Sequence, residues 1–233
     1  TVTGRLIEAI HRLVSRPVVE TITLVGRDLR QACRLACDRI RGERTATVAS
    51  PDSYSGPSIS ERHFVGLLAE IAVAEYFGLQ INTATSTDPG YDFPIEFDGE
   101  RGGLDSKGST HDDPRLLVTE GSVDSEFYVL SRVNLREYSV DCQQNTYAVN
   151  PNKIVLDRRP PVGDRNTDES TRRTESVEID LLGWATKDDI LDAEVLVHSS
   201  SPSHTLSTGK LRALPVPSAV IHSTDSRPPK WDR

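Results

Sequence analysis

The stretch from Gly90 to Gly108 constrains the fold of this chain more than any other. Residues 93–97 alternate between apolar side chains and polar or proline residues, which is the period-2 pattern of a half-buried strand. Asp98-Gly99 is a turn signal, and residues 104–107 are typical of a returning strand. The sequence therefore predicts a β-hairpin near the middle of the chain.

The returning strand carries the candidate chemistry. Asp105 and Lys107 are two residues apart, so both point to the same face of the sheet. The hairpin is expected to bring Asp92 close to them. Two carboxylates beside one ammonium group can bind a divalent metal and steady a water molecule next to it. The alternative is a surface hairpin in which Asp105 and Lys107 form only a weak salt bridge.

A helix is predicted just upstream, over residues 59–77. Ser58-Ile59-Ser60-Glu61 offers a capping box, and apolar residues at helical spacing follow it. Glu70 lies on the same side of this helix as Gly66 and Phe77, so it does not belong to a freely solvated face. By itself, Glu70 is either a functional acid or an ordinary acid at a helix boundary.

Asp92, the tripeptide Asp105-Ser106-Lys107 after a short strand, and the helix that carries Glu70 together resemble the PD-(D/E)XK nuclease superfamily. The resemblance covers roughly residues 58–133 and, more weakly, residues 177–190. It implies an α/β fold with a restriction-endonuclease-like core, in which helices flank a central mixed β-sheet. It also implies an endonuclease that hydrolyses phosphodiester bonds with Mg²⁺, for which Mn²⁺ substitutes.

The resemblance and the chemistry of phosphodiester cleavage together assign a role to each residue. Asp92 and Asp105 would bind the metal directly, with the Ser106 carbonyl as a third ligand. Glu70 would hold a metal-bound water or a second metal. Lys107 would orient the attacking water and stabilise developing negative charge.

Two other functions stay open at this point. One departure from the family motif is that Tyr91, not proline, precedes Asp92. The chain could be a non-catalytic nucleic-acid-binding or scaffold protein that keeps the nuclease fold. It could also be a different metal-dependent hydrolase that uses a carboxylate-rich hairpin. Cleavage of nucleic acid would separate the nuclease from the scaffold, and trials on small phosphoesters would identify another hydrolase.

The charge of the chain restricts how nucleic acid could bind. The 233 residues include 35 acids and 27 bases and carry a net charge of −8, which argues against a broad basic surface. A local arginine groove remains compatible with this balance, and DNA is the favoured substrate. Its candidate residues lie in a polar insert over residues 142–175 and are Arg158, Arg159, Arg172 and Arg173. The acid-rich, lysine-poor composition also resembles proteins of salt-loving or high-GC organisms.

The cysteines and the apolar segments bear on where the protein works. No apolar run is long enough to span a bilayer and no signal peptide opens the chain, so we expect a cytoplasmic protein without membrane contact. Three cysteines, of which Cys33 and Cys37 are four residues apart, do not suggest a disulfide framework. We expect these two to be small buried side chains in a reducing compartment, and the alternative is a pair of metal ligands at i, i+4.

The chain is expected to have three parts. A helical N-terminal extension spans residues 1–57, with helices near residues 6–14 and 27–40. A nuclease-like domain spans residues 58–222, and a flexible tail spans residues 223–233. The extension has three candidate roles: it covers one face of the sheet, forms the contact of a homodimer, or contacts substrate.

The later elements complete the predicted sheet. Residues 127–133 are expected to form a strand beside the one that carries Lys107, and residues 177–184 form another, followed by a short helix. Residues 199–209 are expected to form a polar loop. The tripeptide His111-Asp112-Asp113 is interpreted as a solvated turn, because adjacent residues on a loop do not converge easily on one metal.

Overall fold

The computed structural model describes residues 19–46, 57–81, 83, 90–151, 155–156, 173–198 and 201–222. The first predicted helix and the predicted tail therefore lie outside the described residues. Within the described part, the fold is α/β, with a mixed β-sheet and few helices. No described helix is both long and apolar enough to cross a membrane.

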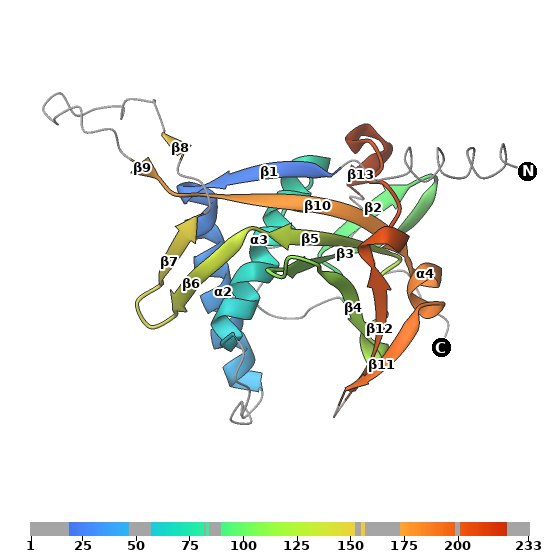
Figure 1. Cartoon of the computed structure of the whole chain (residues 1–233), viewed down its shortest axis with the longest axis horizontal. Helices are drawn as coiled ribbons and strands as arrows, with labels where there is room; N and C mark the ends of the chain where they lie inside the picture. Colours follow the sequence, from blue (N-terminus) through green and yellow to red (C-terminus); the bar gives the residue numbers. More distant parts are fainter. Residues whose placement is uncertain are drawn as a thin grey trace, which may run out of the picture.

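The central sheet has the order β1-β10-β5-β3-β2-β13 among the described residues (Figure 1). β3 runs parallel to β5, and the other neighbouring pairs are antiparallel. The bounds are β1 Glu20–Val25, β2 Phe93–Phe97, β3 Glu100–Ser109, β5 Phe127–Val133, β10 Ser176–Thr186 and β13 Val220–His222. The predicted hairpin is confirmed as β2 and β3, and the strand predicted beside Lys107 is confirmed as β5.

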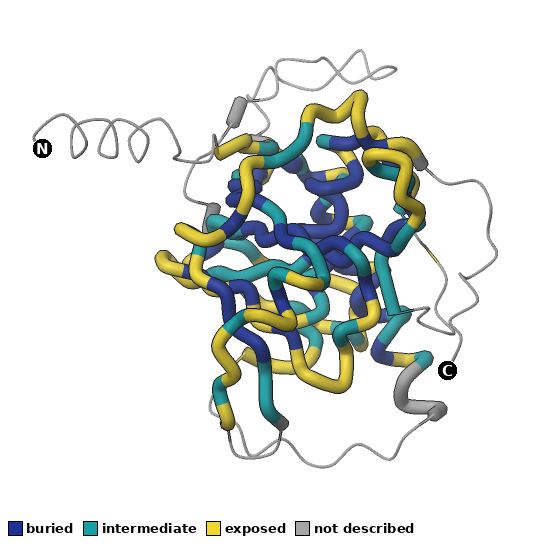
Figure 2. Tube along the Cα trace, turned by 90° about the vertical axis from the view of Figure 1, so that its right-hand side faces the viewer, coloured by how far each residue is buried: buried dark blue, intermediate teal, exposed yellow. Residues whose placement is uncertain are grey.

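Two long helices, α2 (Gly26–Ala46) and α3 (Ile59–Phe77), pack against each other on one face of this sheet. The predicted capping box starts α3: the Ser58 hydroxyl accepts the Glu61 N–H at 3.3 Å, and the Glu61 carboxylate accepts the Ser58 N–H at 2.7 Å. Most residues of α3 are buried around the whole helix. Figure 2 shows the buried segments gathered in the middle of the molecule. Because α3 is central, it carries Glu70 into the interior.

A second, smaller sheet covers the other face of β5 and β10. Its order is β11-β12-β4, and Figure 1 shows it beside α4. The bounds are β4 Arg115–Thr119, α4 Lys187–Leu191, β11 Glu194–His198 and β12 Ser201–Ser207. Successive side chains of β5 point to opposite faces of the sheet. Phe127 and Val129 belong to the core formed with α2 and α3. Tyr128 and Leu130 belong to the core formed with the small sheet. The described residues thus stack in three layers.

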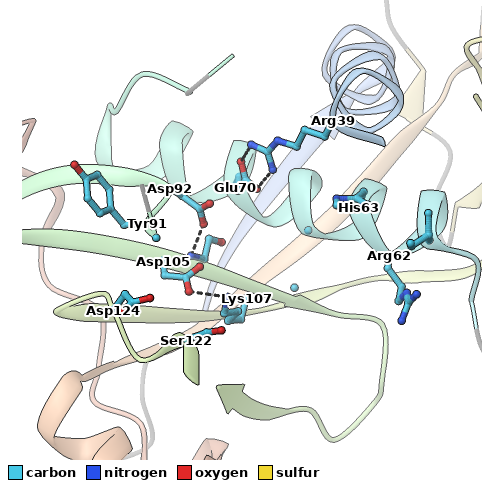
Figure 3. A pocket seen from close by; sticks show the side chains of 15 residues that line it. Arg39, Arg62, His63, Glu70, Tyr91, Asp92, Asp105, Lys107, Ser122 and Asp124 are labelled. Carbon is cyan, nitrogen blue, oxygen red and sulfur yellow. Dashed lines mark hydrogen bonds and ion pairs between the residues drawn. The ribbon is translucent and has the colours of Figure 1, made fainter. Parts of the chain in front are cut away.

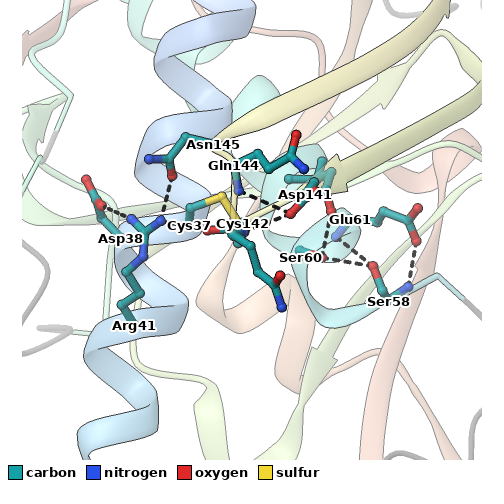
Figure 4. Close-up of a disulfide and its surroundings, with 12 residues drawn as sticks. Cys37, Asp38, Arg41, Ser58, Ser60, Glu61, Asp141, Cys142, Gln144 and Asn145 are labelled. Atoms are coloured by element: carbon teal, nitrogen blue, oxygen red, sulfur yellow. Dashed lines mark hydrogen bonds and ion pairs between the residues drawn. A yellow bond between two sulfur atoms is a disulfide. The ribbon is translucent and has the colours of Figure 1, made fainter.

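A separate hairpin beside α2 consists of β6 (Leu135–Asp141) and β7 (Thr146–Pro151). A disulfide bond between Cys37 and Cys142 ties α2 to this hairpin (Figure 4). Arg41 donates to the Cys142 carbonyl at 2.6 Å beside the bond. The expectation that the cysteines form no disulfide was therefore wrong. The 105 residues between the two cysteines hid their proximity. Disulfides are typical of oxidising compartments, so the cysteines give no support to a reducing cytoplasm.

Three further segments differ from the sequence analysis. The N-terminal extension, predicted to be helical, contributes β1 to the central sheet, where Thr21 Oγ1 donates to Asp180 of β10 at 2.7 Å. The predicted loop over residues 199–209 contains β12, which is held between two partner strands. The predicted insert over residues 142–175 contains β7, and two short paired strands follow, β8 (Val155–Leu156) and β9 (Arg173–Thr174).

Candidate active site

The candidate site lies where β3 extends past the end of β2. β2 pairs with β3 as far as Leu104, whereas β5 pairs with β3 from Leu104 to Ser109. In the described structure, the far half of β3 therefore has no strand on its β2 side. A cleft of about 660 Å³ opens there, between α3 and the short 3-10 helix η1 (Glu120–Ser122).

Asp92 directly precedes β2 and lies in the gap that this strand leaves. Its N–H donates to the Leu104 carbonyl at 3.0 Å, and its Oδ2 accepts the Ser106 N–H at 2.7 Å. The carboxylate thus replaces the next strand residue as the partner of β3. Burial, and then the charges of Glu70 and Asp105, raise the pKa of Asp92 well above its usual range, against the opposing effect of the Ser106 hydrogen bond.

Asp105 and Lys107 project from one face of β3, as predicted. Gly108 faces α3, since a Cβ on it would lie 2.8 Å from the Val65 carbonyl oxygen, and alternation turns Lys107 and Asp105 to the opposite face. Lys107 Nζ lies 2.6 Å from Asp105 Oδ2. The side chain of Asp105 is 12% exposed and that of Lys107 is 38% exposed. The ammonium group therefore remains accessible to a ligand in the cleft.

Glu70 reaches the cleft from the opposite wall, on α3. Arg39 of α2 donates two hydrogen bonds to it, from Nη1 to Oε1 at 2.7 Å and from Nη2 to Oε2 at 2.8 Å. Figure 3 shows Asp92 between Glu70 and Asp105. The paired guanidinium and carboxylate form the strong, bidentate type of ion pair. Sequence reasoning missed Arg39, because 31 residues separate it from Glu70 and no local pattern links them.

The carboxylate oxygens are suitable ligands for a divalent cation, but they are not arranged around a metal position in the described structure. Among the described residues, no three His, Cys, Asp or Glu side chains are grouped so that they could hold a metal ion. Arg39 holds Glu70 and Lys107 holds Asp105. Oxygen ligands of this kind suit Mg²⁺. Burial, and then neighbouring negative charges that a cation would offset, raise the pKa of Asp92. A metal bound by Glu70 would have to displace Arg39, which donates to both of its oxygens, whereas on Asp105 the Lys107 ammonium group contacts Oδ2.

The structure brings one predicted group of residues together and leaves another untested. The cleft is lined by all the predicted catalytic and metal-binding residues, which are Glu70, Asp92, Asp105, Ser106 and Lys107. The buried Ser106 hydroxyl has no hydrogen-bond partner within the described structure. Of the predicted nucleic-acid-binding arginines, Arg158, Arg159 and Arg172 lie outside the described residues, and Arg173 is described only by its backbone in β9.

The cleft also contains residues that the sequence analysis did not single out. Arg62 and His63 line it from α3, and Asp124 lines it from the segment after η1. Helical spacing relative to Glu70 is the signal that could have found the first two. The tripeptide at residues 111–113 forms an exposed bend outside the cleft, as predicted.

Comparison of the chain with protein-family models, with curated proteins and with solved structures gave no match.

Proposed function

We propose that this protein is a Mg²⁺-dependent endonuclease with a restriction-endonuclease-like core, related to the PD-(D/E)XK superfamily. One observation carries the proposal. Glu70 on α3, Asp92 before β2, and the Asp105 and Lys107 pair on β3 line the same cleft. A hairpin whose charges served only as a surface salt bridge would not need a buried glutamate from another element beside it.

The acidic residues divide into two groups across the cleft. Asp92 and Asp105 stand next to each other and would hold the cation, while Glu70 on the opposite wall would accept a hydrogen bond from a water molecule. When bound, Mg²⁺ would supply charge stabilisation on the phosphate oxygens and make that water more acidic. The elevated pKa of Asp92 makes its free carboxylate costly without such a cation.

Lys107 provides a positive charge at the edge of the same group. Its Nζ is 2.6 Å from Asp105 Oδ2 and partly accessible, so it can donate a hydrogen bond to a phosphate oxygen or to the attacking water. Asp105 limits where Nζ can lie and therefore orients it. We assign Lys107 as the catalytic cation of the chain and Asp105 as both metal ligand and positioning residue.

Plasmid nicking in Mg²⁺ or Mn²⁺ tests the proposal. Asp105→Asn should abolish nicking and weaken metal binding measured by calorimetry. Lys107→Ala should abolish nicking and keep metal binding. Glu75→Gln removes an exposed acid of α3 that does not line the cleft, so it serves as the matched control and should cut like the wild type. Wild-type cleavage that persists in Lys107→Ala would rule out this assignment.

A second candidate function is a nucleic-acid-binding or scaffold protein that no longer cuts. The observation that favours it is the pairing of Glu70 with Arg39 and of Asp105 with Lys107, which neutralises two acids that a metal would need. In that case, wild-type protein would bind an oligonucleotide without cutting it in either metal. Calorimetry would then detect no Mg²⁺ binding.

A further inference from the structure

One side of α3 forms a continuous wall of the cleft. The α3 residues that line it are Ile59, Arg62, His63, Gly66 and Glu70, and their spacing of three or four places them along one face of the helix. At about 1.5 Å of rise per residue, this wall is roughly 16 Å long. In Figure 3, Arg62 and His63 lie on α3 on one side of the carboxylates, and Tyr91 lies on the other. The cleft is therefore an elongated track rather than a pocket around the acids alone.

Gly66 marks the middle of this wall and has no packing reason to be glycine. A Cβ on Gly66 would meet no atom within 4 Å. Glycine inside a helix costs about 1 kcal/mol relative to alanine. Gly108 of β3 differs, because it packs directly against α3 and a Cβ there would lie 2.8 Å from the Val65 carbonyl oxygen. Packing therefore explains Gly108, whereas the absent side chain of Gly66 only widens the cleft.

The charges of the track change sign along its length. Arg62 is exposed and His63 is half-buried at the end toward the start of α3. Asp124 also lines the cleft, and Figure 3 shows it on the side of Asp105 away from Arg62. On a chain with a net charge of −8, a polyanion is attracted only where cations gather locally. At the end toward the start of α3 the positive charge comes from Arg62, and the wall leads from there to the carboxylates.

We propose that one strand of a nucleic acid lies along α3, crosses Gly66, and places consecutive phosphates near Arg62 and His63. This inference rests on the proposed function, because it takes the carboxylates as the position of the scissile phosphate. A strand carries about one negative charge per 3.4 Å of duplex axis, so the wall is long enough for several phosphates. Gly66 lets the strand pass close to the helix backbone.

The test fills the track at Gly66 and measures binding separately from cleavage. Gly66→Leu adds a bulky side chain of good helix propensity, and Gly66→Ala is its matched control, which should also melt slightly higher. Binding of a short fluorescein-labelled oligonucleotide is measured by anisotropy without metal. Cleavage is measured on plasmid and on bis(p-nitrophenyl) phosphate, a small diester that needs only the acidic end of the cleft.

We expect Gly66→Leu to weaken oligonucleotide binding about tenfold or more, which is about 1.4 kcal/mol. Plasmid cleavage should fall with it, and by a larger factor than the rate on the small diester, which needs only the acidic end of the cleft. Arg62→Gln should also weaken binding and reduce the salt dependence by about one phosphate contact. Arg136→Gln removes an exposed arginine of β6 outside the cleft and should bind like the wild type.

The outcomes separate the track from the catalytic proposal. If Gly66→Leu or Arg62→Gln is folded by circular dichroism and binds the oligonucleotide as tightly as wild type, the track is wrong even when the wild type cuts. If both variants bind weakly but the wild type cuts nothing, the track stands and the nuclease proposal fails. A wild type that binds no oligonucleotide overturns the track. If Gly66→Leu does not fold, the binding of Arg62→Gln compared with its control Arg136→Gln decides whether the track is correct.

Discussion

Replacing Arg39 by methionine should destabilise the protein through the buried carboxylate that it leaves behind. The Glu70 side chain is 7% exposed and that of Arg39 is 25% exposed. Removing one partner of a buried ion pair costs about 3–5 kcal/mol, and the partial exposure of Arg39 places this case lower, at about 2–3 kcal/mol. For a chain of this size, one kcal/mol shifts Tm by about 2–4 °C. We therefore expect Tm to fall by roughly 5–10 °C.

Two further variants identify the cause of this loss. Glu70→Gln should lower the free energy of unfolding by about 1 kcal/mol or less. The substitution removes the ion pair, but it also removes a negative charge that repels Asp92. The double variant Arg39→Met/Glu70→Gln should recover much of the stability lost in Arg39→Met, and the difference gives the coupling energy of the pair. Arg34→Met is the control, since Arg34 is an exposed arginine of α2 that does not line the cleft.

Measuring Tm with and without Mg²⁺ is a second test on the same variants. A ligand at ten times its Kd stabilises the folded state by about 1.4 kcal/mol. In Arg39→Met the cation would replace the missing guanidinium beside Glu70, so Mg²⁺ should raise Tm more than it does in the wild type. The reasoning fails if Tm of Arg39→Met lies within about 2 °C of wild type. It fails equally if Mg²⁺ shifts both proteins by the same amount.

Three other changes have defined outcomes. Because the pKa of Asp92 is raised in the folded state, the contribution of Asp92 to the free energy of unfolding is fully present below the unfolded pKa, about 3.9, and is lost as pH rises through the folded pKa. Asp92→Asn should therefore raise Tm at pH 8 and lose this advantage near pH 4. Reducing the Cys37–Cys142 bond should cost about 2–5 kcal/mol in denaturant unfolding, and an unchanged midpoint would contradict this. Gly108→Ala should cost about 1–3 kcal/mol and slow cleavage, since its Cβ would push α3 at Val65 away from β3; unaltered stability and activity would refute that reason.

Local sequence determined the hairpin and α3. Alternation in residues 93–97 predicts a strand whichever sheet receives it, and Asp98-Gly99 forms the tight turn because both residues adopt positive φ, at 53° and 80°. The capping box at Ser58 and Glu61 starts α3 through hydrogen bonds between residues three apart. These signals act over a few residues, so they can be read without knowing the rest of the fold.

Tertiary structure alone decided which segments meet. Ile22 and Leu24 alternate with threonines in β1, yet only pairing with β10 makes that segment an edge strand. β12 is polar and contains Pro202, and it is a strand because β11 and β4 lie on either side. The Arg39–Glu70 ion pair and the disulfide likewise join residues that are distant in sequence. Such contacts depend on how whole helices and strands pack, and a short stretch of sequence does not encode that packing.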